Sequence, residues 1–95
     1  MTPEQLTLLG SIAGIITTGS FIPQVYKTYK TKSVEDLSYW MLLLMLTGLT
    51  LWLLYGIELN ELPIILTNAI TGALVMSLIV MKYIFTKNHP EKNIG

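Results

Sequence analysis

The chain contains a run of uncharged, mostly apolar residues at 6–25, and two further apolar runs follow at 37–57 and 62–85. About 20 helical residues, rising 1.5 Å each, span the roughly 30 Å hydrocarbon core of a bilayer. Inside that core the backbone N–H and C=O groups need partners within the segment, which a helix supplies. We therefore expect an all-α membrane protein with three transmembrane helices.

Composition supports a membrane protein and argues against several other classes. Hydrophobic residues make up 52% of the chain and charged residues 13%, whereas a soluble domain carries roughly 25% charged residues. The net charge of zero gives no support for binding nucleic acid. Without cysteine, neither a disulfide framework nor a thiolate metal site is possible. We expect no metal, no cofactor and no enzymatic activity, because the spans contain no nucleophile and base pair and no metal-ligand cluster.

Capping signals predict where the helices begin. Thr2 and Gln5 form a capping box with a proline at the first helical position, and Ser33 with Asp36 repeats the pattern before the second apolar run. Asn60, in a short acidic turn, is a candidate cap for the third helix. The expected helices cover about 4–26, 35–57 and 62–85.

Lysines predict the orientation in the membrane. They cluster at Lys27, Lys30 and Lys32 and again after the third helix, whereas the N-terminal segment and the second loop contain none. The positive-inside rule then places the N-terminus outside and the C-terminus in the cytoplasm of a multi-pass cell (inner) membrane protein. Lys82, near the end of the third helix, is expected to reach outward. Residues 1–86 form the transmembrane unit and residues 87–95 a polar cytoplasmic tail.

Two side chains point to a binding site at a shared depth. Trp52 lies about five residues before the second turn and Asn68 about six after it, so both lie roughly 8 Å inside the same helix ends. An indole face stacks on the C–H faces of a ring, and an amide both donates and accepts hydrogen bonds. This pairing matches what sugar hydroxyls offer and suits a neutral polyol, such as a mono- or disaccharide, better than an ion.

The same residues also have purely structural interpretations. Trp52 can belong to an interfacial aromatic belt, and Asn68 can bond two helices to each other. Gly10 and Gly14 form a GxxxG pattern that is typical of close helix packing. These alternatives stay open on the sequence alone.

Three helices that pack around their own side chains leave no path for a solute. Two copies related by a two-fold axis along the membrane normal enclose one, so a transporter of this size is expected to be a parallel homodimer. Pro23 removes a backbone donor from the first helix and becomes a hinge candidate near the inner mouth of such a path.

Four motifs across the three apolar runs together resemble the PQ-loop family, specifically its bacterial SemiSWEET sugar transporters. They are Phe21-x-Pro23-Gln24, Thr47-Gly48, Trp52-x-x-Tyr55-Gly56 and Thr67-Asn68. The similarity covers about residues 6–85. It implies a triple-helix bundle with the third helix between the first two, a parallel homodimer and alternating access. It also implies that Trp52 and Asn68 line the sugar pocket.

The resemblance also implies two gates. The family's inner gate falls on Phe21 and Met41, and the pair Pro23 and Gln24 acts as the hinge. The outer gate falls on Tyr55 and Glu61. Members commonly place an arginine two residues before that outer acid, but this sequence has leucine at position 59 and no arginine at all. The sequence therefore lacks the arginine of an outer salt bridge of that kind, although Tyr55 can still bond to Glu61 across the dimer.

The leading interpretation is a facilitative sugar transporter that works by alternating access as a homodimer in the lipid bilayer. No carboxylate or histidine lies deep in a span to relay protons, so no ion gradient is expected to be needed. Two alternatives remain. One is a PQ-loop carrier of another small solute such as an amino acid, and the other is a non-transporting scaffold subunit that assembles with a larger membrane partner.

Overall fold

The computed structural model describes residues 1–91 and forms three helices within them. Helix α1 covers Pro3–Thr31, α2 covers Tyr39–Leu59 and α3 covers Leu62–Asn88. Each helix is long and apolar enough to cross a membrane. The expected all-α fold with three spanning helices is confirmed. Residues 92–95 of the expected polar tail lie outside the described part.

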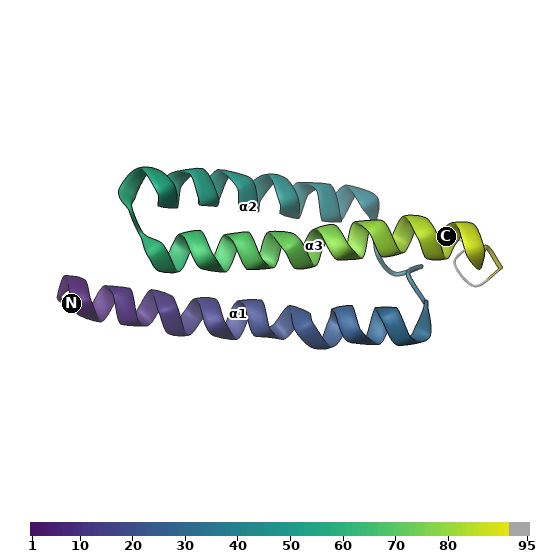
Figure 1. The fold of residues 1–95 in the computed structure, drawn as a ribbon, viewed down its shortest axis with the longest axis horizontal. Coiled ribbons are helices and arrows are strands. Elements are labelled where there is room, and N and C mark those ends of the chain that lie inside the picture. The colour runs from purple at the N-terminus through teal and green to yellow at the C-terminus, as the bar shows by residue number, and fades with distance from the viewer. Residues whose placement is uncertain (92–95) are drawn as a thin grey trace.

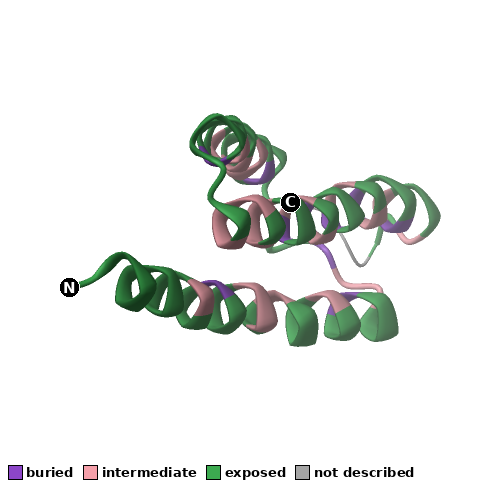
Figure 2. Ribbon diagram, turned by 60° about the vertical axis from the view of Figure 1, so that its left-hand side comes forward, coloured by how far each residue is buried: buried purple, intermediate pink, exposed green. Residues whose placement is uncertain are grey.

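The three helices lie side by side in one layer, with α3 between α1 and α2 (Figure 1). The described chain has principal-axis extents of 54 × 22 × 15 Å, and within it α1 and α2 each pack on α3 and not on each other. Consequently most of every helix is exposed, and buried positions occur mainly where two helices meet (Figure 2). The predicted central place of the third helix is confirmed.

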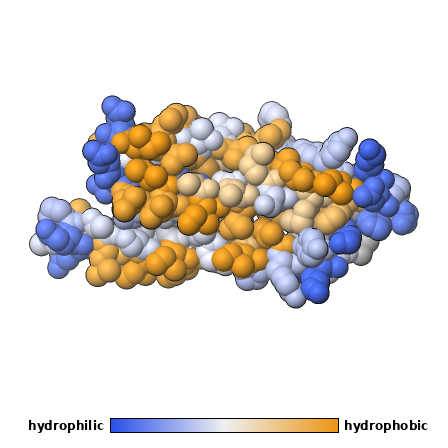
Figure 3. Space-filling view, in the orientation of Figure 1, coloured by the Kyte–Doolittle hydropathy of each residue, from blue (hydrophilic) through white to orange (hydrophobic). Residues whose placement is uncertain are grey.

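The two ends of the layer differ in charge. We call the end with the N-terminus and residues 58–61 the turn end, and the end with Lys27, Lys30, Lys32 and Lys87 the lysine end. Hydrophobic side chains cover the middle of the layer, and hydrophilic side chains gather at both ends (Figure 3). This distribution matches a layer of helices that crosses the hydrocarbon core.

The first helix begins as the sequence predicts. Thr2 Oγ1 accepts a hydrogen bond from the Gln5 N–H at 3.1 Å, and Gln5 Oε1 accepts one from the Thr2 N–H at 2.9 Å. The reciprocal capping box is therefore complete, with Pro3 at the first helical position.

The boundary between the first two helices was predicted wrongly. Helix α1 continues past residue 26 to Thr31 and ends where Lys32 adopts a left-handed conformation with φ of 57°. Lysines and tyrosines bridge the membrane boundary with long amphipathic side chains, so the helix need not stop where the apolar run stops. Helix α2 begins at Tyr39 with Ser38, not Ser33, as its N-cap, because Val34 turns the chain by accepting a hydrogen bond from the Leu37 N–H.

The junction of α2 and α3 also differs from the prediction. Asn60 is the left-handed C-cap of α2, with φ of 55°, and Glu61 occupies the N-cap position of α3. Asparagine tolerates the left-handed conformation better than most residues, which explains why it ends one helix instead of starting the next. At its far end α3 continues to Asn88, three residues beyond the expected limit.

The core is small and lies between the helices towards the lysine end. Leu42 of α2 and Val75 and Leu78 of α3 form a buried cluster, and Phe21 and Val25 of α1 pack against it. The buried positions of α3 recur every three or four residues, as expected for one face of a helix. They are Thr71, Val75, Leu78, Lys82 and Phe85.

Small and polar residues join α1 to α3. A Cβ atom at Gly14 would overlap the Thr67 side chain, so only glycine allows this approach. Farther along, Thr18 Oγ1 and Thr71 Oγ1 share a hydrogen bond of 2.8 Å. Gly14 therefore packs as its motif suggests, whereas a Cβ at Gly10 would meet no other atom of the described chain within 4 Å.

We predict that Gly14→Val lowers the free energy of unfolding by about 1–3 kcal/mol, because the added side chain forces α1 away from α3. Gly10→Val is the matched control, since it makes the same change in the same helix but extends into open space. Thermal unfolding of both variants in one detergent measures the difference. Equal destabilisation of the two variants would show that the close approach of α1 and α3 at Gly14 does not contribute to stability.

Candidate functional site

Helix α2 carries an aromatic hollow on an exposed face. The hollow has a volume of about 430 Å³ and is lined by Gly48, Leu51, Trp52 and Tyr55. We call it the Trp52 hollow. Residues spaced by three or four lie on one face of a helix, which is why this part of α2 gathers them. A Cβ at Gly48 would meet no described atom within 4 Å, so the glycine leaves the floor of the hollow open.

The two rings of the hollow pack against each other. Trp52 and Tyr55 pack edge to face, with ring centroids 5.5 Å apart and an angle of 84° between the planes. Trp52 is nevertheless 56% exposed and Tyr55 53% exposed. The indole therefore presents a large apolar surface that its own protomer does not cover, next to a phenol hydroxyl that can donate or accept.

Asn68 lies half-buried on α3 and turns its amide towards its own helix. Its Nδ2 donates to the Ile64 carbonyl oxygen at 2.8 Å. This single bond leaves the Oδ1 acceptor and one N–H available to another molecule. Within one protomer Asn68 neither bonds another helix nor lines the Trp52 hollow, as far as the described chain goes. A site that uses both Trp52 and Asn68 therefore has to combine the Trp52 hollow with a second surface, the one that carries Asn68.

The predicted outer gate residues share a second hollow. Tyr55 and Glu61 both line a depression of about 540 Å³ at the turn end, together with Met1, which precedes α1, and Pro3, its first residue. Tyr55 thus borders this depression and the Trp52 hollow. The structure brings the pair to one place without a hydrogen bond between them among the described residues.

The predicted inner gate and hinge residues lie nearer the lysine end. Phe21 packs against the core cluster, while Met41 is exposed in the first turn of α2, where its N–H is capped by Ser38 Oγ at 3.4 Å. Pro23 lies inside the continuous α1 helix and has no N–H to offer the carbonyl one turn earlier. Gln24 follows it with an exposed side chain.

Lys82 does not reach outward as predicted. It is only 6% exposed, and its Nζ donates to the Val34 carbonyl oxygen at 3.0 Å. The same ammonium lies 5.2 Å from the centroid of the Tyr39 ring, at a distance that permits a cation–π interaction. Lys82 therefore fastens the loop between α1 and α2 to α3, because Val34 is the fully buried residue of that loop.

Sequence reasoning missed Lys82 although a signal was present. Its position continues the buried stripe of α3 at intervals of three and four residues, so the helical period alone places it inward. Thr18 and Thr71 lie in the spans as well, and their hydroxyl groups bond to each other inside the protomer. No comparable signal identifies Leu51, a common apolar residue, as part of the Trp52 hollow.

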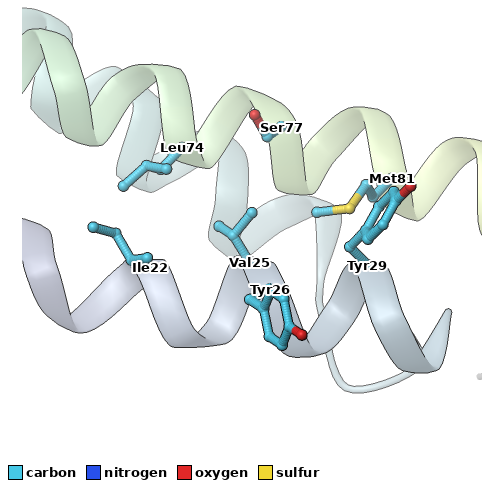
Figure 4. A pocket seen from close by; sticks show the side chains of 7 residues that line it. All are labelled: Ile22, Val25, Tyr26, Tyr29, Leu74, Ser77 and Met81. Carbon is cyan, nitrogen blue, oxygen red and sulfur yellow. The ribbon is translucent and has the colours of Figure 1, made fainter.

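A third depression lies between α1 and α3 (Figure 4). It has a volume of about 430 Å³ and is here called the Tyr26 groove. Its lining residues are Ile22, Val25, Tyr26, Tyr29, Leu74, Ser77 and Met81. Ser77 follows Asn68 by about two and a half helical turns, so the groove opens on the face of α3 opposite Asn68.

Comparisons with known proteins agree on one family. The sequence matches the PQ loop repeat family over residues 6–65. It is 42% identical over 82 residues to the sugar transporter SemiSWEET of Bradyrhizobium diazoefficiens, an alignment that covers 86% of this chain and 95% of that relative. The sugar transporter SemiSWEET of Leptospira biflexa is 39% identical, with 86% and 94% covered.

A solved structure shows the same fold. The crystal structure of a bacterial homologue of SWEET transporters superposes with a TM-score of 0.81 and 46% sequence identity, over 85% of this chain and 98% of that one. The named relatives are transporters, not enzymes, and three apolar spanning helices make the chain a membrane protein. The chain therefore belongs to the PQ-loop family and has bacterial SemiSWEET sugar transporters among its relatives.

Proposed function

We propose that the protein is a facilitative sugar transporter that holds its substrate between Trp52 and Asn68 of two protomers. The observation that carries this proposal is the Trp52 hollow, in which an indole that packs edge to face on Tyr55 is left more than half exposed. Such a ring face suits the C–H face of a sugar, and the unused atoms of the Asn68 amide suit its hydroxyl groups. The relatives named as sugar transporters support the same substrate class.

The working unit in this proposal is a parallel homodimer. Both outer helices pack directly on α3, so side chains fill the space between the helices of one copy and leave no path there. The Trp52 hollow is open on one face, so a second copy facing it completes the wall and supplies the second Trp52 and Asn68. One copy alone presents half a site.

Transport in this proposal is passive. The residues that line the Trp52 hollow include one phenol and no carboxylate, histidine or lysine. A proton-coupled carrier needs a group that binds and releases a proton on the transport path, and ionisable side chains inside a membrane usually mark such a relay. We therefore expect uptake to follow the sugar gradient alone.

The gates and the orientation complete the mechanism. We place the lysine end in the cytoplasm, where the positive-inside rule puts it. Phe21 and Met41 then close the inner mouth, while Tyr55 and Glu61 close the outer one. Pro23 and Gln24 form the hinge, because α1 lacks one backbone hydrogen bond at Pro23 and bends there at lower cost.

We predict that Pro23→Ala slows sugar exchange at least several-fold while leaving the dimer intact, because alanine restores the missing N–H and stiffens the inner half of α1. Exchange of labelled for unlabelled sugar across proteoliposomes measures the rate of switching between states. Ala13→Ser is a control at an exposed position elsewhere in α1. An exchange rate equal to that of the unmodified protein would remove the hinge role.

The function itself is tested by uptake of radiolabelled glucose and sucrose into proteoliposomes, with no ion gradient imposed and with the dimer verified by light scattering. Saturable uptake is expected, and an added proton gradient should leave it unchanged. Stimulation by protons would contradict the passive mechanism. Uptake of labelled amino acids without uptake of sugar would indicate another solute, and no uptake of either class by a verified dimer would favour the scaffold.

A further inference from the structure

We propose that the Tyr26 groove binds one anionic phospholipid, with an acyl chain along the groove and the phosphate at Lys30 and Lys32. The groove is a binding site separate from the sugar site, because it opens on the opposite face of α3 from Asn68. In the dimer proposed above, that face looks outward into the bilayer. A groove between two helices at this position is bathed by lipid.

The groove walls suit a hydrocarbon chain. Ile22 and Val25 of α1 face Leu74 and Met81 of α3 across it (Figure 4). The hydroxyl of Ser77 is not free to attract water, because its Oγ donates to the Ala73 carbonyl oxygen at 3.0 Å. The only other polar atoms of the lining side chains are the hydroxyl groups of the two tyrosines.

Two ammonium groups mark the lysine end of the groove. Lys30 Nζ lies 5.8 Å from the centroid of the Tyr26 ring, and Lys32 Nζ lies 4.7 Å from that of the Tyr29 ring. Lys32 Nζ also donates to the Tyr29 carbonyl oxygen at 3.1 Å, which fixes its position. Both tyrosines line the groove. When the acyl chain of a phospholipid lies in the groove, its phosphate is therefore close to the two lysines.

Charge favours a lipid over a second protein copy in this groove. Lys27, Lys30 and Lys32 fall within six residues that contain no acid. A parallel copy seated here would bring its own lysines against these, and like charges repel. An anionic headgroup instead neutralises them, and each lysine near an anionic lipid surface favours binding about fivefold.

The position of the groove also suggests a role for the lipid. Ile22 precedes Pro23 and Val25 follows it, so a chain in the groove contacts α1 on both sides of the hinge and α3 as well. This consequence rests on the proposed transport function. Binding itself does not, so the experiment below measures binding without transport and fails independently of it.

Native mass spectrometry of the purified protein with phosphatidylglycerol and with phosphatidylcholine of identical acyl chains tests the proposal. We expect one tightly retained phosphatidylglycerol per protomer. Lys30→Gln should weaken its retention about fivefold and the double variant with Lys32→Gln about 25-fold. Lys87→Gln, in the last turn of α3, is the control and should leave retention unchanged. Equal loss in the control would overturn the site in favour of diffuse surface charge.

The groove itself is tested by Ser77→Phe, which fills it with a ring, and by Leu44→Phe as a control at an exposed position of α2. Ser77→Phe should release the lipid and Leu44→Phe should not. Equal retention of both lipids by the unmodified protein would overturn the anionic preference. Unchanged retention by Ser77→Phe would overturn the place of the acyl chain.

Discussion

Trp52→Ala is expected to lower the apparent affinity for sugar roughly 5- to 150-fold, because each lost ring contact is worth about 0.5–1.5 kcal/mol and the dimer loses two. The variant also removes the edge-to-face partner of Tyr55, whose centroid lies 5.5 Å away. Tyr55 also borders the turn-end depression, so a Tyr55 ring that no longer packs on Trp52 adds to the loss of apparent sugar affinity. Concentration dependence of uptake into proteoliposomes measures the effect.

Trp40→Ala is the matched control for this prediction. Trp40 lies on the same helix and is 72% exposed, but it is one residue into α2 and does not line the Trp52 hollow. It should leave uptake unchanged if its role is that of an interfacial anchor. Both variants are checked for an intact dimer. Equal uptake by the two variants would mean that Trp52 is a residue of the interfacial aromatic belt and that α2 does not carry the sugar site.

The contacts of Asn68 distinguish between two roles that the sequence left open, a bond between two helices and contact with a solute. An amide that bonds two helices should be satisfied within the protomer, but the Asn68 amide bonds only to Ile64 of its own helix. A hydrogen bond between two helices of the protomer joins Thr18 to Thr71 instead. The polar atoms left on Asn68 favour a partner outside the protomer, which is either a solute or the second copy.

The sequence predicted the fold well because the bilayer restricts it. An uncharged run that spans the hydrocarbon core has to be a helix, and three runs with short connections follow from that rule alone. The central place of α3 came only from the family resemblance, since no periodicity in α1 or α2 states which neighbour each prefers. The capping box at Thr2 was predicted correctly because it depends on residues three apart.

The wrong boundaries arose where tertiary contacts overrule local signals. Ser33 and Asp36 have the spacing of a capping box, yet Val34 is drawn inward between the helices and leaves the pair in the loop. The partner that draws it in is Lys82, which lies 48 residues away in the sequence. A contact at that separation has no local signature, so the loop and its lysine were both misjudged.

The sequence predicted which residues form the candidate site but not how they are oriented relative to one another. Trp52 and Tyr55 come together because they lie three residues apart on one helix, which the sequence states directly. The distance of Trp52 and Asn68 from the turn at residues 58–61 predicts a common depth in the membrane. It does not predict which face of the layer each side chain points to. Their faces depend on how α2 and α3 rotate against each other, and that rotation is set by the packing of Gly56 on Ile64 and of Leu42 in the core.

Lys82→Met is expected to loosen the loop between α1 and α2 while keeping α3 packed. Methionine retains the apolar stem of lysine but not the ammonium that donates to the Val34 carbonyl oxygen at 3.0 Å. A hydrogen bond to a charged group contributes about 1.5–3 kcal/mol, so amide hydrogens of the loop should exchange roughly 10- to 100-fold faster. The Leu37 N–H, which bonds to the same carbonyl, is the reporter.

Two further variants separate the bond from the charge. Lys87→Met removes the next lysine along α3 and should leave exchange at Leu37 unchanged. Lys82→Arg keeps a positive donor near Val34 and should give an intermediate rate, since guanidinium differs from ammonium in shape. Unchanged exchange in Lys82→Met would mean that relief from burying the charge offsets the lost bond. If the loop does loosen, then Lys82 joins the loop between α1 and α2 to α3, and the bending at Pro23 is left to α1.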